Sequence, residues 1–159
     1  MSEFMCKSKE INKLKAEFCA KSCNEKLARS LVSAMVVQLD PKINELSDIV
    51  TAVSEAVTNA IIHGYGKSDK KKDEFIIKME CVLFENAIEV SIEDEGCGIE
   101  NIEKAREPLY TSSPELERSG MGFTVMETFM DEIKVESSVG VGTKVTMKKK
   151  IESVKNECQ

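Results

Sequence analysis

The sequence contains no apolar run of the roughly 18–20 residues that a helix needs to span a bilayer. Residues 1–15 carry lysines but no apolar segment of the kind found in a secretory signal peptide. We therefore expect a protein that stays in the cytoplasm and makes no use of a membrane.

The sequence also contains little histidine, since His63 is the only one among its 159 residues. The six cysteines form no zinc-binding spacing with it, since only Cys19 and Cys23 lie close together in the sequence. A disulfide framework is a feature of secreted chains, so we expect ordinary reduced thiols.

Positive charge is in deficit, with 22 Lys and Arg against 28 Asp and Glu and a formal net charge of -6. An acidic chain has no broad electrostatic attraction to nucleic acid, so direct DNA or RNA binding is excluded as a primary role. A hydrophobic content of 42% in a chain of this length is typical of one globular domain with its own core.

The apolar pattern predicts the order strand, helix, helix, two strands, long loop, helix and two strands. The expected strands are 14–20, 74–84, 87–93, 132–137 and 142–149, and the expected helices are 24–39, 41–63, 102–106 and 121–130. Asn24 and Asp40 are expected N-caps, and Gly64 is expected to end the second helix.

Strands joined by short turns are antiparallel, which favours an α+β fold. We predict a two-layer α/β sandwich, in which a mixed, mostly antiparallel sheet has helices on one face. The domain is expected to span residues 13–150, with a flexible N-terminal tail at 1–12 and a polar C-terminal tail at 151–159.

The clearest helix carries Glu55, Asn59 and His63 at intervals of four residues. This spacing puts them on one helix edge beside the apolar stripe. A carboxylate and a carboxamide in that position suit a general base and an oxygen ligand for Mg²⁺. Polar helix edges are also common without any function, so by itself this pattern leaves both interpretations open.

Two glycine-bearing segments add candidate ligand contacts. Asp94 ends a predicted strand, and Gly96 and Gly98 after it allow a sharp turn and a close backbone approach to a ligand. Its carboxylate can accept a hydrogen bond from an exocyclic amine such as that of adenine. A plain glycine-rich turn is the alternative.

The second segment, residues 118–122, immediately precedes a predicted helix. Free backbone N–H groups at a helix N-terminus bind phosphate, and Arg118 can add a charge-assisted contact. The alternative is an ordinary helix entry turn.

Taken in order, four motifs resemble the N, G1, G2 and G3 boxes of the GHKL ATP-binding superfamily, which includes DNA gyrase, MutL and the histidine kinases. They are Glu-x-x-x-Asn-Ala from residue 55, Asp-x-Gly-x-Gly-Ile from 94, Gly-x-Gly-Phe from 120 and Gly-Thr from 142. The resemblance implies the Bergerat ATP-binding fold with ATP and Mg²⁺. The nucleotide contacts that it implies are Asn59 (also the metal ligand), Asp94, Gly96, Gly98, Thr111, Arg118, Gly120, Met121, Gly122 and Thr143.

Longer stretches, at residues 53–65, 106–111 and 114–123, are similar to the anti-sigma factor kinases of spore-forming bacteria. That resemblance implies a homodimeric serine protein kinase that binds a sigma factor and phosphorylates a small anti-anti-sigma protein. Glu55 would be its catalytic base, and residues 108–119 a lid ordered by the γ-phosphate. The first helix, around Glu25 and Arg29, is the candidate partner surface, although a solvated helix face is the plain alternative.

Two alternative functions remain at this point. A histidine kinase catalytic domain has the same boxes but needs a phosphoacceptor histidine, and His63 at a helix end is more typical of a capping or structural residue. A sigma-binding module that holds nucleotide without transferring phosphate is the other, although such a module has no need of a base at Glu55.

Overall fold

The computed structural model describes residues 9–66, 74–107 and 122–152. Its strands are β1 (Glu10–Cys19), β2 (Ile76–Phe84), β3 (Ala87–Asp94), β4 (Glu132–Ser138) and β5 (Gly142–Lys150). Its helices are α1 (Asn24–Val36), α2 (Ile43–Asn59), α3 (Ile102–Ala105) and α4 (Gly122–Phe129), with a 3₁₀ turn η1 (Val37–Leu39) and a π-helical turn η2 (Ala60–Gly64). No helix in these ranges is long and apolar enough to cross a membrane.

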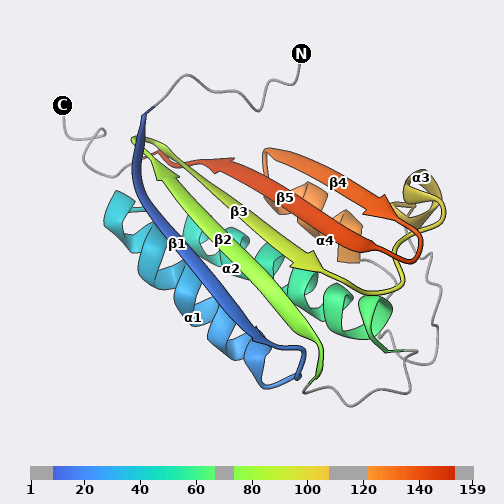
Figure 1. Ribbon diagram of the computed structural model, residues 1–159. Helices are drawn as coiled ribbons and strands as arrows, with labels where there is room; N and C mark the ends of the chain where they lie inside the picture. The colour runs from blue at the N-terminus through green and yellow to red at the C-terminus, as the bar shows by residue number, and fades with distance from the viewer. Residues whose placement is uncertain (1–8, 67–73, 108–121, 153–159) are drawn as a thin grey trace.

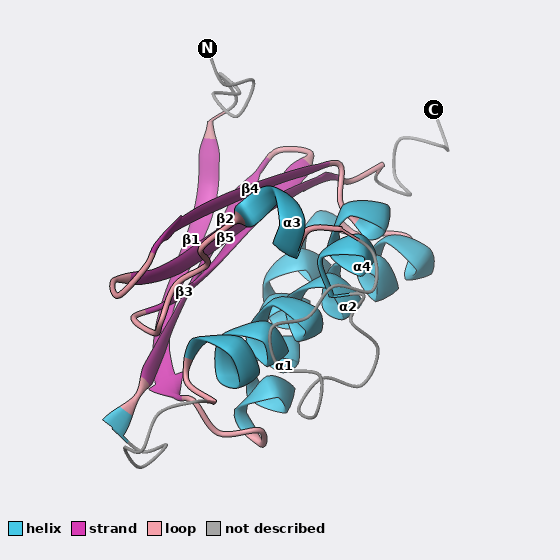
Figure 2. Cartoon of the chain, turned by 90° about the vertical axis from the view of Figure 1, so that its right-hand side faces the viewer, coloured by secondary structure: helices cyan, strands magenta, loops and turns pink. Residues whose placement is uncertain are grey.

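The strands form one sheet in the order β1-β2-β3-β5-β4, and α1, α2 and α4 cover one of its faces (Figures 1 and 2). The predicted two-layer α+β architecture is therefore confirmed. Every neighbouring pair of described strands is antiparallel, so the parallel component that we expected does not occur among them. The reason is that the long connection after β3 leads to the edge strand β4, and the short turn at residues 139–141 then brings β5 back between β4 and β3. Local sequence patterns do not encode that placement.

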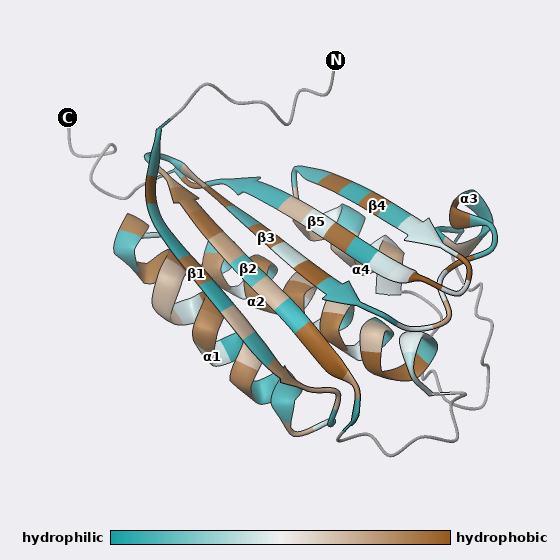
Figure 3. Ribbon diagram, viewed as in Figure 1, coloured by the Kyte–Doolittle hydropathy of each residue, from teal (hydrophilic) through white to brown (hydrophobic). Residues whose placement is uncertain are grey.

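The core lies between the sheet and the helices. Along β3, Ile88, Val90 and Ile92 are buried and alternate with polar residues, an alternation that the colouring of the strands follows (Figure 3). Ile49 and Val53 of α2 pack into the same cluster. Burying each of these side chains contributes roughly 1.5–3 kcal/mol, so these contacts hold α2 firmly against the sheet.

The outer face of the sheet is polar and ordered by charge. One row across all five strands consists of Glu17, Lys78, Glu93, Lys144 and Glu136, each opposite the next in register. Opposite charges at directly paired positions stabilise a sheet, whereas like charges destabilise it. This face therefore needs no helical cover.

The N-terminal strand is longer than predicted, because β1 begins at Glu10 and Asn12 is paired with Leu83. Residues 10–12, which we expected in a flexible tail, are thus part of the sheet. Residues 1–8 of that tail, and the expected C-terminal tail from residue 153 on, lie outside the described residues.

Both predicted N-caps are wrong. Cys23 occupies the N-cap position of α1, and the Asn24 side chain instead donates to the Cys19 carbonyl at 2.8 Å. Asp40 ends η1 with a left-handed φ of 50°, a conformation that Asp tolerates better than most residues. The N-cap of α2 is Lys42, whose N–H donates to Glu45 Oε1 at 2.9 Å.

Candidate functional site

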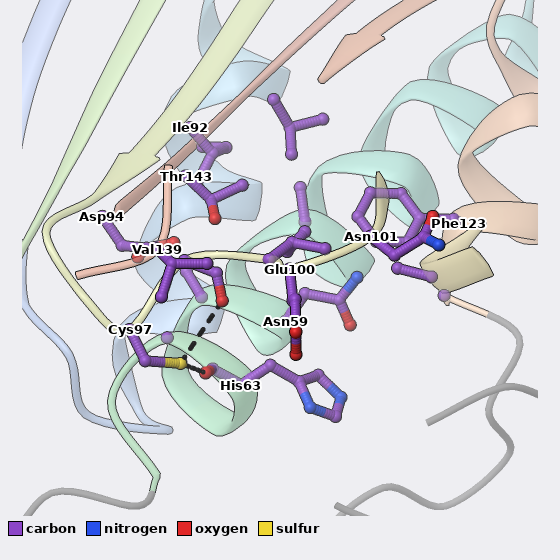
Figure 4. A pocket seen from close by; sticks show the side chains of 18 of the residues that line it. Asn59, His63, Ile92, Asp94, Cys97, Glu100, Asn101, Phe123, Val139 and Thr143 are labelled. Atoms are coloured by element: carbon purple, nitrogen blue, oxygen red, sulfur yellow. Dashed lines mark hydrogen bonds between the residues drawn. The ribbon is translucent and has the colours of Figure 1, made fainter. Parts of the chain in front are cut away.

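A cavity of about 750 Å³ lies between α2 with its π turn, the segment after β3, and α4 (Figure 4). Its volume is within the range of roughly 300–1,000 Å³ that small-molecule sites occupy. Five residues selected from the sequence line it, namely Asn59, Asp94, Gly98, Gly122 and Thr143. The fold thus brings together residues from all four motifs, which are far apart in the chain.

The other selected residues have different positions. Gly96 packs against Gly64 and does not line the cavity. Glu55 is half-buried one helical turn before Asn59 and does not line it either. The remaining nucleotide contacts, Thr111, Arg118, Gly120 and Met121, fall outside the described residues, as does the expected lid.

Asp94 is the buried carboxylate of the cavity, with 6% of its surface exposed. Oδ1 accepts a hydrogen bond from Gly96 N at 2.9 Å. Burial raises the pKa of Asp94 to about 6, and the backbone N–H groups of Gly96 and Thr143 oppose that rise. The carboxylate is therefore ionised at neutral pH and can accept hydrogen bonds from a ligand in the cavity.

Glycines make the room around Asp94. Gly142 has φ +138°, and a Cβ there would lie 2.1 Å from the Asp94 carbonyl oxygen. A Cβ on Gly96 would lie 2.0 Å from the carbonyl oxygen of Gly64. Only glycine permits these backbone approaches, which explains why the motifs from residues 94 and 142 need it.

The π turn η2 forms the part of the cavity wall next to Asp94. Gly64 O accepts from Cys97 N at 3.0 Å, and His63 O accepts from the Cys97 thiol at 2.9 Å (Figure 4). His63 itself lines the cavity, although its sequence position suggested only a structural role. The α-helix had been expected to run to Gly64. Periodicity does not distinguish a final π turn from an α turn, and π turns recur at functional sites.

Asn59 is close to the N-terminal end of α4. A Cβ on Gly122 would come within 2.9 Å of the Asn59 carboxamide, so glycine lets α4 approach α2. Figure 4 shows Asn101 and Phe123 at this end of the cavity and Asp94 with Cys97 at the other. Lys104 is the one lysine or arginine among the described lining residues. The cavity therefore has an Asp94 end and an Asn59 end, where α4 begins.

The sequence motifs missed Ser137, whose hydroxyl links the segment after β3 to the start of β5 near Asp94. Its Oγ accepts from Ile99 N at 2.7 Å, donates to Gly142 O at 3.0 Å and lies 2.8 Å from Thr143 Oγ1. A serine in a strand has no distinctive pattern, so no sequence signal could have indicated this role.

The two residues selected for a partner surface lie on α1. Glu25 Oε1 accepts from Ser54 Oγ of α2 at 2.5 Å and lies 3.5 Å from Arg29 Nε. Ser54 directly precedes Glu55 in the chain. The α1 surface is thus connected to the part of α2 that carries the candidate base.

None of the four described cysteines, Cys19, Cys23, Cys81 and Cys97, forms a disulfide. No cluster of three His, Cys, Asp or Glu residues in the described ranges could hold a metal ion.

Comparison with known proteins defines first a class and then a family. The model of the histidine kinase-like ATPase domain matches residues 20–149. The anti-sigma F factor of Clostridium novyi is 56% identical over 143 residues, which cover 90% of this chain and 97% of that protein. The anti-sigma F factor of Clostridium perfringens strain SM101 is 61% identical over 140 residues, covering 88% and 97%. The chain therefore belongs to the anti-sigma F factor family, within the histidine kinase-like ATPase class.

A solved structure shares the fold at low identity. The RsbU and RsbW domains of a Mycobacterium tuberculosis protein superpose with a TM-score of 0.63 at 18% identity. The match covers 88% of this chain and 32% of that one. The resemblance predicted from the four motifs is thus confirmed both in sequence and in fold.

Proposed function

We propose that this chain is an anti-sigma factor that binds and inhibits a sporulation sigma factor, sigma F. As an ATP-dependent serine kinase it also phosphorylates and thereby inactivates its anti-anti-sigma antagonist. The observation that carries the proposal is the cavity with Asp94 at one end and Asn59 at the other, in a chain whose relatives are anti-sigma F factors.

The described residues fit ATP as the cavity's ligand. The ionised Asp94 carboxylate accepts from the adenine amine, and the N-terminal end of α4 beside Asn59 faces the phosphates. Thr143, paired with Asp94 in the sheet, lies at the adenine end. Arg118, Gly120 and Met121 would complete the phosphate contacts, and Thr111 would join them from the lid.

Mg²⁺ fits the same end. This ion usually keeps several waters and takes one or two protein ligands besides the phosphates, so the Asn59 oxygen needs no carboxylate cluster around it. When bound, Mg²⁺ neutralises phosphate charge during transfer. Because Gly122 leaves no atom in the way, the Asn59 carboxamide is held where α4 begins.

Glu55 is the proposed general base. A serine hydroxyl must lose its proton as the phosphorus–oxygen bond forms, and a positioned carboxylate that accepts it contributes typically 10²–10⁴-fold. Glu55 lies one turn before Asn59 on the rigid helix α2. It therefore lies one helical turn from the proposed metal ligand, a spacing that suits a base acting next to the bound phosphates.

The α1 surface around Glu25 and Arg29 is the proposed partner surface, and the chain acts as a homodimer that holds one sigma factor. Arg29 lies on a helix packed against α2, so it is a rigid interface anchor. Sigma factors act in the cytoplasm, where we place the protein, and no direct nucleic-acid contact is part of the proposal.

The deciding experiment incubates the full chain with γ-labelled ATP, sigma factor and anti-anti-sigma protein. Label on a serine of the anti-anti-sigma protein supports the kinase. If the sigma factor is bound and no label transfers, the chain is a nucleotide-loaded binding module. Label on histidine instead would favour a histidine kinase-like domain.

A further inference from the structure

Tyr65 directly follows the π turn and does not line the cavity. Only 5% of its surface is exposed. Its hydroxyl donates to Ile76 O at 2.9 Å and accepts from Glu95 N at 2.6 Å. One side chain thus connects the end of α2 with the first residue of β2 and with the residue after β3.

The Tyr65 hydroxyl lies between β2 and the segment after β3, just beyond the last paired residues, Lys78 and Glu93. Lys78 stands opposite Glu93 in the β2–β3 ladder, so the same register puts Ile76 opposite Glu95. Opposite residues of an antiparallel pair can bond through their own N–H and C=O groups. Here two hydrogen bonds through the phenol replace the direct bond from Glu95 N to Ile76 O. The tyrosine is a spacer that parts the strands immediately after Asp94.

Two features hold this spacer in place. The Tyr65 ring stacks on Phe75 with a centroid distance of 4.2 Å and an interplanar angle of 19°. Burial raises the pKa of the Tyr65 phenol above its ordinary value of 10.0, so the hydroxyl keeps the proton that it donates. The hydroxyl is therefore a fixed donor to β2 and a fixed acceptor from the loop after β3.

The parting of the strands affects the position of Asp94. On one side Asp94 is paired with Thr143 of β5, and on the other it is followed by Glu95, whose N–H is bound by Tyr65. Without the phenol, the ladder can close by one more pair and draw Glu95 toward β2. That movement would pull the Asp94 carboxylate away from Thr143 and from the cavity that both residues line.

The geometry points to Tyr65 as a positioning residue that sets base specificity by holding the Asp94 carboxylate in the cavity. The inference rests on the proposed function, in which Asp94 recognises the exocyclic amine of adenine. Tyr65 acts through Asp94 and the loop after it, without touching the nucleotide itself.

The test compares the binding of ATP with that of inosine triphosphate, in which a carbonyl replaces the exocyclic amine. The full chain is titrated by calorimetry as wild type, Tyr65→Phe and Asp94→Asn. Tyr65→Phe keeps the stacked ring and removes both hydrogen bonds. It is expected to weaken ATP binding about tenfold while leaving inosine triphosphate binding nearly unchanged, so the preference for ATP shrinks about tenfold.

The outcomes separate the two proposals. If Asp94→Asn loses the preference for ATP and Tyr65→Phe keeps it, the role of Tyr65 is wrong and the adenine assignment stands. If Asp94→Asn keeps the preference, the adenine assignment itself fails. Val36→Ala removes two buried methyl groups of α1 outside the cavity and controls for general destabilisation. It is expected to keep the wild-type preference, and losing it would overturn the inference.

Amide hydrogen exchange in the wild-type chain tests the same inference even if Tyr65→Phe does not fold. The Glu95 amide should exchange slowly although it lies beyond the last ladder pair, and ATP should slow it more than inosine triphosphate does. Exchange at the rate of an unprotected amide, or equal protection by both nucleotides, would contradict the role of Tyr65.

Discussion

Gly64 and Asp94 lie against each other, because a Cβ at position 64 would come within 2.8 Å of Asp94 Oδ1. Real Cβ atoms essentially never lie so close to another atom, so any side chain at position 64 must displace the carboxylate. The end of the π turn and the candidate adenine-binding residue are therefore fitted to each other.

This contact predicts that Gly64→Ala lowers the affinity for ATP more than it lowers the stability of the protein. Overpacking costs roughly 1–3 kcal/mol, and here the strain falls on the Asp94 carboxylate. Calorimetry should show at least about tenfold weaker ATP binding. Gly140→Ala is the control for destabilisation without this contact, because alanine is strained at the φ of +78° found there but a Cβ meets nothing within 4 Å. Equal ATP affinities in the two variants would disprove the contact's importance.

Asp94→Asn should stabilise the ligand-free chain at pH 7.5 while weakening ATP binding. The pKa of Asp94 rises from 3.8 to about 6 on folding, so the folded state binds this proton more tightly than the unfolded state does. The stability that Asp94 contributes is therefore greatest at low pH and declines as pH rises toward 6. Asp94→Asn removes the buried charge, so it should raise the free energy of unfolding by up to about 3 kcal/mol at pH values above 6.

The measurement is thermal unfolding of both chains between pH 4.5 and 8, with adenosine binding followed in parallel. Adenosine is chosen because the phosphates of ATP titrate in the same range. Wild-type adenosine affinity should fall as pH drops through about 6, where the carboxylate becomes protonated, and that of Asp94→Asn should stay flat. A wild-type affinity that does not depend on pH would exclude the ionised carboxylate as the acceptor.

Glu55→Gln should separate binding from catalysis. The substitution keeps size and hydrogen-bonding reach and removes basicity. Serine phosphorylation should fall about 10²-fold or more, with ATP and sigma-factor binding largely intact. Glu136→Gln on the outer sheet face is the control for a lost carboxylate. Near-normal phosphorylation by Glu55→Gln, with ATP binding verified, would place the base elsewhere.

Arg29→Ala should reduce binding of the sigma factor or of the anti-anti-sigma protein without changing ATP affinity. Arg29 lies 3.5 Å from Glu25, whose carboxylate also receives Ser54 Oγ, so the variant removes one member of a connected surface. Lys26→Ala removes an exposed cation from the same helix and controls for charge. If pull-down shows both partners bound as before, Arg29 is not part of the interface.

Much of the site was accessible from sequence because its determinants are local. Glycines that let the chain turn or approach closely identify the segments after β3 and before β5, and the helical interval of four places Asn59 one turn from His63. These features depend on residues next to one another in the chain. For the same reason the hairpin turn at residues 85–86 was placed correctly.

The sequence by itself thus determined the order of elements, the two-layer architecture and the residues at the two ends of the cavity, since periodicity and glycine spacing are properties of short segments. Tertiary structure alone decided that η2 is a π turn, that Asp40 ends one helix rather than beginning the next, and that Tyr65 and Ser137 brace the Asp94 end. The roles of Tyr65 and Ser137 depend on contacts between segments that are distant in the chain, since Tyr65 reaches Glu95 and Ser137 reaches Ile99. Such contacts exist only after the sheet has assembled, and no local pattern of side chains encodes them.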